Sequence, residues 1–79
     1  MEVRFFAGAA DAAGMETSTV DASGKTAADV VAALGDANER LATVLKVCAL
    51  LADGVRVNDL GRDLSDVTRL DVLPPFAGG

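Results

Sequence analysis

Ala49-Leu50-Leu51-Ala52-Asp53-Gly54-Val55-Arg56-Val57 is the segment that says most about how this chain folds. A helical spacing of apolar residues runs into it from the preceding residues, so periodicity alone leaves helix and strand open. Asp53-Gly54 resolves the choice, because a two-residue hairpin turn needs a positive φ at both central positions and this dipeptide tolerates it. We therefore predict two strands, at about residues 47–52 and 55–58.

A helical region precedes this hairpin. Thr26 is its predicted N-cap, and Asp29 three residues later makes a weak version of the capping box. Gly35 is predicted to end a first helix in the left-handed conformation, and Asp36 with Glu39 to start a second. The sequence thus predicts one helical region with a break near Gly35.

The two ends of the chain predict further strands. Residues 1–7 alternate so that Val3 and Phe5 share one face while Phe6 points to the other. Residues 8–14 are predicted as a turn or a single helical turn, and residues 16–20 as a second strand that pairs with the first. After the Asp53-Gly54 hairpin, residues 60–67 are predicted as a loop with Leu64 facing inward, and residues 69–73 as the final strand.

This order of elements predicts an α+β protein with the β-grasp, or ubiquitin-like, fold: a mixed sheet of about five strands with the helical region packed on one face. The first and last strands should lie side by side and parallel at the centre of the sheet. If Leu70 and Val72 face the core, Asp71 and Leu73 point to the open face of the sheet, where Phe6 also points. We therefore predict an apolar patch of Phe6 and Leu73 on that face.

Composition limits the possible functions. With 79 residues the chain makes one domain, predicted as residues 1–75 with a flexible tail at 76–79. The net charge of −5 and the scattered basic residues argue against nucleic acid as a partner. No apolar run is long enough for a membrane span, and the first residues do not resemble a signal peptide, so we expect a cytoplasmic protein without a membrane partner. Cys48 is the single cysteine, which agrees with a reducing compartment.

The last residues suggest where chemistry takes place. Gly78 and Gly79 have no Cβ atoms, so they can thread a narrow channel and present a carboxylate to a reactive centre. The rigid pair Pro74-Pro75 separates them from the final strand. A carboxylate is a poor electrophile until a phosphate is attached to it, so a partner that uses ATP is implied.

The ending Leu73-Pro74-Pro75-Phe76-Ala77-Gly78-Gly79 resembles that of the ubiquitin-like sulfur carriers, and specifically of the small subunit of molybdopterin synthase (MoaD-like). The residues Val3 to Ala7, the hairpin at Asp53-Gly54 and the length extend the resemblance to the whole chain. The family usually has Gly-Asp in the turn before the last strand, whereas Asp66-Val67-Thr68-Arg69 stands here. Carriers for thiamine or cysteine synthesis, and ubiquitin-like protein modifiers, remain alternatives.

The resemblance implies a mechanism in which an E1-like enzyme adenylates the Gly79 carboxylate with ATP. A sulfur donor protein then displaces AMP and leaves a thiocarboxylate. Two carriers would insert their tails (Phe76, Ala77 and Gly78) into a dimer of the large synthase subunit, where the sulfur builds the dithiolene of molybdopterin. In this heterotetramer the carrier binds no cofactor of its own, the catalytic residues belong to the large subunit, and Phe6, Leu73, Pro74 and Pro75 are the expected partner contacts.

The chain itself offers little for catalysis. Without His, and with one cysteine, it has no plausible zinc site and no pair of nucleophile and base. Cys48 is interpreted as a small apolar core residue and Lys25 as a solvated charge. We therefore expect a carrier, and not an enzyme that acts alone.

Overall fold

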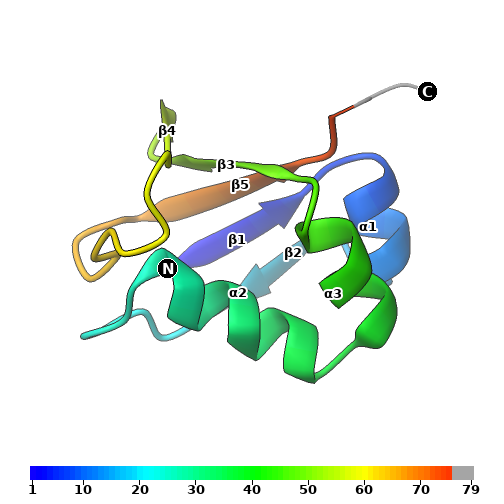
Figure 1. Cartoon of the computed structure of the whole chain (residues 1–79), viewed down its shortest axis with the longest axis horizontal. Helices are drawn as coiled ribbons and strands as arrows, with labels where there is room; N and C mark the ends of the chain where they lie inside the picture. Colours follow the sequence, from blue (N-terminus) through cyan, green and yellow to red (C-terminus); the bar gives the residue numbers. More distant parts are fainter. Residues whose placement is uncertain (76–79) are drawn as a thin grey trace.

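The computed structural model describes residues 1–75, which form a five-stranded mixed sheet with three helices (Figure 1). The strand order in the sheet is β2-β1-β5-β3-β4. In chain order the elements are β1 (Glu2–Phe5), α1 (Gly8–Ala13), β2 (Thr17–Thr19), α2 (Ala27–Asp36), α3 (Glu39–Leu45), β3 (Ala49–Ala52), β4 (Val55–Arg56) and β5 (Arg69–Leu73). The predicted β-grasp architecture is confirmed.

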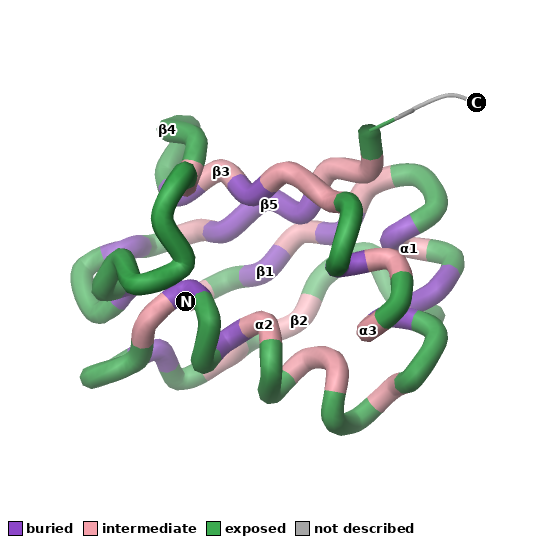
Figure 2. The backbone as a smooth tube through the Cα atoms, viewed as in Figure 1, coloured by how far each residue is buried: buried purple, intermediate pink, exposed green. Residues whose placement is uncertain are grey.

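The core lies between the sheet and the helices, which all cover the same face of the sheet (Figures 1 and 2). Alternate residues of the central strands supply the sheet side of this core, and α2, α3 and the long loop after β4 supply the other side. The largest side chains that are fully buried are Leu64, Leu70, Val3, Val30 and Val72. Leu64 anchors its loop in the core as the sequence predicts.

The parallel pair of β1 and β5 occupies the centre of the sheet. Val3 is opposite Leu70 and Phe5 is opposite Val72, and all four side chains are buried. β1 also pairs antiparallel with β2, and β5 pairs antiparallel with β3. The first and last strands therefore hold the sheet together from its middle, as predicted.

The Asp53-Gly54 turn has the predicted geometry, with φ of 48° at Asp53 and 84° at Gly54. The Asp53 carboxylate also accepts hydrogen bonds from the backbone N–H groups of Thr68 (3.1 Å) and Arg69 (2.9 Å). Asp53 thus takes part in the hairpin turn and also fixes the start of β5. These two bonds order the segment where the chain departs from the Gly-Asp turn typical of the sulfur carriers.

The helical region breaks later than predicted. α2 begins with the predicted capping box, in which Thr26 Oγ1 accepts from Asp29 N–H and the Asp29 carboxylate accepts from Thr26 N–H. Gly35, however, lies inside α2, and the φ of this glycine is not positive. Its lack of a Cβ serves packing, because an added Cβ would lie 3.0 Å from the Cβ of Ala42 on α3.

The N-cap of the second helix is also not where the sequence placed it. Asn38 caps α3: its Oδ1 accepts from Leu41 N–H at 3.1 Å, and its Nδ2 donates to Ala12 O at 2.8 Å. Asp36, predicted as part of this start signal, is instead the last residue of α2. Asn38 is favoured because its amide caps one helix and ties it to another, which a carboxylate cannot do.

Other boundaries shift by a few residues. Within residues 8–14, Gly8–Ala13 form a true helix, α1, which is capped at its C-terminus by Gly14 with φ of 73°. β3 begins at Ala49 and not at residue 47, because α3 and the turn after it extend further than predicted. β4 ends at Arg56, although Val57 N–H still donates to Leu50 O at 2.8 Å.

In the part of the chain that the structure describes, no helix is long and apolar enough to cross a membrane.

The hydrogen bonds to Asp53 predict how stability depends on pH. The bonds from Thr68 and Arg69 N–H lower the pKa of the Asp53 carboxyl below its usual value. A carboxyl whose pKa is lower in the folded state stabilises the fold fully above its unfolded pKa of about 3.9, and this contribution is lost as the pH falls through the folded pKa. We expect the melting temperature to fall on acidification from about pH 7 to about pH 3, and to fall less in the Asp53→Asn variant. Circular dichroism melts measure both.

Asp66→Asn is the matched control, because it removes the same charge from the neighbouring loop at a side chain that makes no hydrogen bond within residues 1–75. The melting temperatures of Asp53→Asn, Asp66→Asn and the unmodified protein could all fall by the same amount on acidification. In that case the Asp53 hydrogen bonds would not be the source of the pH dependence.

Candidate functional site

The predicted tail continues from the central strand β5. Leu73, the last residue of β5, lies opposite Ala49 of β3 and is half-buried. Pro74 is half-buried and Pro75 is exposed. The predicted tail residues Phe76, Ala77, Gly78 and Gly79 lie outside the described residues. The structure therefore shows where the tail begins, at one end of the sheet's central strand.

The helices leave the other side of the sheet uncovered, and we call this side the open face. Its residues alternate along each strand with residues of the core and match across the sheet in the observed register. The open face consists of Glu2, Arg4, Thr17, Thr19, Ala49, Leu51, Arg56, Arg69, Asp71 and Leu73. Leu73 is thus on the predicted face.

A buried carboxylate lies at the centre of the open face. Asp71 of β5 is only 6% exposed. Arg4, its neighbour across the parallel pair, donates from Nε to Asp71 Oδ1 at 2.9 Å and from Nη2 to Oδ2 at 3.3 Å. Nε of Arg69 lies 3.5 Å from the same Oδ1. The hydrogen bond with Asp71 raises the pKa of Arg4 above its usual value.

Phe6 follows β1 and is held between this ion pair and a tight turn. The Arg4 guanidinium lies 5.3 Å from the centroid of the Phe6 ring, within the range of a cation–π contact, and this contact places the ring on the side of the open face. Phe6 N–H donates to Val72 O at 3.1 Å, and Phe6 O accepts from Ala9 N–H at 3.0 Å. The turn requires Ala7 to adopt φ 48° and ψ −125°, an unusual conformation for alanine. The backbone around Phe6 is therefore fixed from both sides.

The sequence predicts Phe6 and Leu73 on this face but not the charged group between the strands. Arg4 and Asp71 stand at outward positions of two strands that were predicted to be neighbours and parallel. Opposite charges at paired outward positions form cross-strand ion pairs. Placing the two predicted strands side by side would have suggested that Arg4 has an acidic partner on the last strand. That this partner is Asp71 depends on the register, which only the structure supplies.

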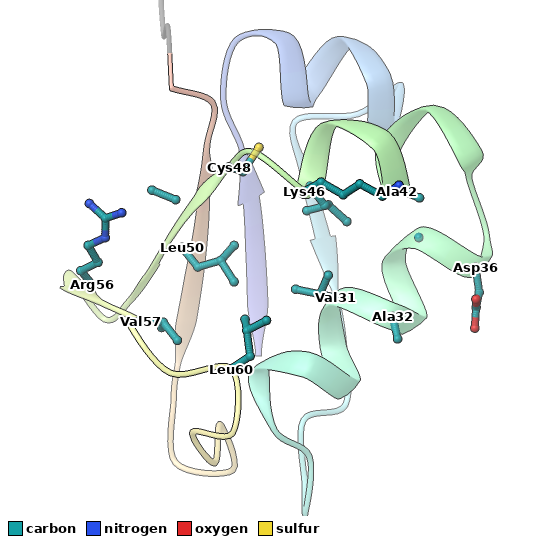
Figure 3. A pocket seen from close by; sticks show the side chains of 13 residues that line it. Val31, Ala32, Asp36, Ala42, Lys46, Cys48, Leu50, Arg56, Val57 and Leu60 are labelled. Carbon is teal, nitrogen blue, oxygen red and sulfur yellow. The ribbon is translucent and has the colours of Figure 1, made fainter.

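Cys48 lies on the helix side of the molecule, at a hollow of about 490 Å³ between α2, α3 and the β3–β4 hairpin (Figure 3). Its thiol donates to Val44 O at 3.2 Å, and partial burial raises the pKa of the thiol. It packs against the core as a half-buried residue. A thiol whose pKa is raised is a poor nucleophile, so Cys48 fits the role of a small core residue.

Lys25 and the possible metal ligands are the remaining candidates. Lys25 is exposed in the loop before α2. Among residues 1–75, no group of three or more His, Cys, Asp and Glu side chains is placed to hold a metal ion. The described part of the chain thus provides an uncovered sheet face and the residues that lead into the tail.

Comparison with known proteins agrees with the β-grasp fold described above. The ThiS family model matches residues 3–79. Among solved structures, SAMP1 from Haloferax volcanii is similar, with a TM-score of 0.77, 29% identity, and coverage of 100% of this chain and 98% of the other. No curated protein matches the sequence.

Two further solved structures from Haloferax volcanii resemble this chain. The small archaeal modifier protein 1 has a TM-score of 0.76 at 27% identity, with 95% of each chain covered. The HVO 2177 protein has a TM-score of 0.73 at 27% identity, with 99% of this chain and 84% of the other covered. With a β-grasp sheet whose central strand leads into the tail, and a family match that spans nearly all residues, this chain belongs to the ThiS family of ubiquitin-like sulfur carriers.

Proposed function

We propose that this protein carries sulfur as a thiocarboxylate on Gly79. An E1-like partner adenylates the Gly79 carboxylate with ATP and releases pyrophosphate. The terminal sulfur of a persulfide on a donor protein then displaces AMP, and a thiol reductant cleaves the S–S bond of the resulting acyl disulfide to leave the thiocarboxylate. The observation that carries the proposal is the end of central strand β5 in a ThiS-family chain: Leu73 lies on the open face, and the residues that lead into the tail follow it directly. A partner that covers the open face can therefore receive the tail in the same encounter.

For delivery of the sulfur we favour the route that the resemblance at Pro74-Pro75 and the residues after them implies. In it the chain is the small subunit of molybdopterin synthase, and the large subunit takes the tail and uses the sulfur for the dithiolene of molybdopterin. Pro74-Pro75 supports this, because two prolines form a stiff, extended spacer between the sheet and the tail. Such a spacer holds the start of the tail away from the docked sheet.

A second candidate function is protein modification, in which the activated Gly79 carboxyl forms an amide bond with a lysine of another protein. The likeness to SAMP1 and to the small archaeal modifier protein 1 favours it. Both functions begin with the same adenylate, and they differ in the nucleophile that displaces AMP.

Intact-mass spectrometry after co-expression with the E1-like enzyme of the same genome distinguishes the two functions. A sulfur carrier gains the mass difference between sulfur and oxygen, whereas a modifier yields adducts of the size of a whole protein. If neither product forms with the wild-type chain, the proposed function is wrong.

A residue added after Gly79 should abolish sulfur transfer, because the chemistry needs a free carboxylate at a fixed reach. The melting temperature should not change, since the core is built from residues before the tail. A reconstituted synthase assay, with thermal melts of the same samples, measures both effects. Full activity of the extended protein would rule out Gly79 as the site of sulfur.

Gly78→Val should fail in the same assay, because a β-branched residue is too wide for a channel shaped for backbone. Ala77→Gly is its control: it changes the same tail without adding bulk. We expect activity close to wild type for Ala77→Gly.

Cys48→Ala should leave the amount of thiocarboxylate unchanged, because the thiol is a core group and not the carrier. The loss of a half-buried sulfur should reduce the free energy of unfolding by about 1–2 kcal/mol at most. Denaturant unfolding measures the stability, and intact mass measures the sulfur. A folded Cys48→Ala protein that gains no sulfur would instead indicate a persulfide on Cys48.

Phe6→Asp should keep a cooperative melt near that of wild type, because the ring lies outside the buried core. It should weaken binding to the activating enzyme and to the large subunit by roughly 2 kcal/mol or more, as expected for an aromatic anchor. Leu60→Asp is the control, since it places the same charge on another apolar residue, 53% exposed, in the loop beyond β4. Titration calorimetry that shows equal affinities for both variants would remove Phe6 from the interface.

A further inference from the structure

The sheet ends at an edge strand, β2, on the side opposite β4 (Figure 1). Among residues 1–75, β1 is the strand that pairs with it. Val20 N–H donates to Met1 O, and Phe5 N–H donates to Glu16 O. Because backbone groups alternate in direction along an antiparallel pair, Glu16, Ser18 and Val20 turn their N–H and C=O groups toward β1. The residues between them turn these groups the other way.

Thr17 and Thr19 therefore direct their backbone N–H and C=O groups out of the sheet, and we call these groups the β2 edge. They have no hydrogen-bond partner within the described part of the chain. Proteins commonly protect such an edge with lysine, proline or a bulge. Residues 16–20 contain neither lysine nor proline, and their pairing with β1 is regular. The β2 edge can therefore accept a further strand.

An apolar hollow of about 310 Å³ lies on the helix side of this edge, and we call it the β2 hollow. Ala33 and Leu34 of α2, Leu41 of α3 and Met15 before β2 line it, and Ser18 is the residue of β2 that reaches it. Met15 is 49% exposed although it is large and apolar. The residue of an added strand that lies opposite Ser18 shares its face of the sheet, so its side chain would enter the β2 hollow.

Carboxylates stand at both ends of the β2 edge. Glu16 comes directly before β2, Asp21 follows shortly after it, and both residues are exposed. Neither forms an ion pair within residues 1–75. The chain as a whole carries a charge of −5. A segment with basic residues at its ends is therefore attracted to this edge, and an acidic segment is repelled from it.

We propose that the β2 edge binds an extended segment of another protein as a sixth strand of the sheet. Its backbone pairs with Thr17 and Thr19, a large apolar side chain opposite Ser18 fills the β2 hollow, and Lys or Arg at its ends lies near Glu16 and Asp21. This inference goes beyond the proposed function and does not need Gly79. Because β1 separates β2 from β5, a protein can bind here while the tail is used elsewhere.

Charge disfavours other occupants of the β2 edge. A second copy that paired β2 with β2 in antiparallel orientation would bring Glu16 of one copy close to Asp21 of the other, and like charges in such positions repel. The phosphates of a nucleic acid would meet the same carboxylates. A basic, apolar, extended peptide is the ligand that satisfies the backbone groups, the hollow and the charges together.

The test uses the full-length chain labelled with nitrogen-15 and the synthetic peptide acetyl-Lys-Val-Thr-Leu-Thr-Val-Lys-amide. When its leucine lies opposite Ser18, its two threonines form the hydrogen-bonded pairs with Thr17 and Thr19. A control peptide carries N-methyl groups on both threonines, which removes the N–H groups that would donate to the β2 edge. A second control peptide has Glu in place of both lysines. Titrations followed by the backbone amide signals give the affinity and locate the site.

Two pairs of protein variants test the edge and the hollow separately. Thr19→Pro removes one outward N–H and leaves the ladder to β1 intact, because proline is tolerated where the N–H of an edge strand faces solvent. Thr19→Val is its control, since it keeps the N–H. Ala33→Lys obstructs the β2 hollow, and Ala32→Lys adds the same charge at an exposed neighbour on α2 that lines the hollow at Cys48 instead. Circular dichroism melts confirm that each variant is folded.

We expect the lysine peptide to shift the amide signals of Thr17, Ser18 and Thr19 in a saturable way and to slow hydrogen exchange at Thr17 and Thr19. Thr19→Pro and Ala33→Lys should each weaken binding about tenfold, whereas Thr19→Val and Ala32→Lys should stay within about twofold of wild type. The N-methylated peptide and the glutamate peptide should bind at least about tenfold more weakly, and added salt should weaken binding of the lysine peptide.

Several results would overturn the inference. One is the absence of shifts in β2 at a peptide concentration on the order of 1 mM, which means that the acidic ends only protect the edge. Others are equal affinity for the N-methylated peptide, an equal loss in Ala32→Lys and Ala33→Lys, or shifts confined to residues outside β2 and the β2 hollow. Signals of Thr17 and Thr19 that change with protein concentration alone would assign the edge to a second copy of this chain.

Discussion

The parallel ladder between β1 and β5 is the interaction on which the rest of this structure depends. It joins residues from opposite ends of the chain at the centre of the sheet, and it buries Val3, Phe5, Leu70 and Val72 against the helices. Each such side chain contributes about 1.5–3 kcal/mol when it is removed from water. β2 is added on one side of this pair, and β3 with β4 on the other. The same ladder pairs Arg4 with Asp71 on the opposite face, so one strand pairing determines the contacts in the core and on the open face.

Much of this architecture could be predicted because several local signals agree with one another. The alternation in β1 and β5, the capping box at Thr26 and the Asp53-Gly54 turn each determine a short piece of structure, and together they leave few possible topologies. The order of elements and the outward position of Leu73 followed from these signals. Helix boundaries did not. Gly35 has the residue type of a helix end, but it is placed inside α2 by the close approach of Ala42, which is a tertiary contact with no local signal.

The candidate site divides in a similar way. The tail and the outward side chains are visible in the sequence, because they depend on residue type and on strand parity. The network of Arg4, Asp71 and Arg69 depends on register and on which side chains reach each other, so it became visible only in three dimensions. The turn that holds Phe6 is a further example, since alanine at position 7 gives no warning that its φ will be positive.

The central place of β5 also affects how the chain folds as it is synthesised. β5 spans residues 69–73, so the sheet lacks its middle strand until nearly the whole chain has been made. Contacts between β1 and β5 bridge almost the full length of the chain, and pairing of such distant segments is slow and forms late in folding. A chain truncated before β5 would lack the strand that both halves of the sheet need, and would expose the apolar residues meant to cover it. The pairing of β1 with β5 thus makes completion of the core depend on the segment that directly precedes residues 76–79.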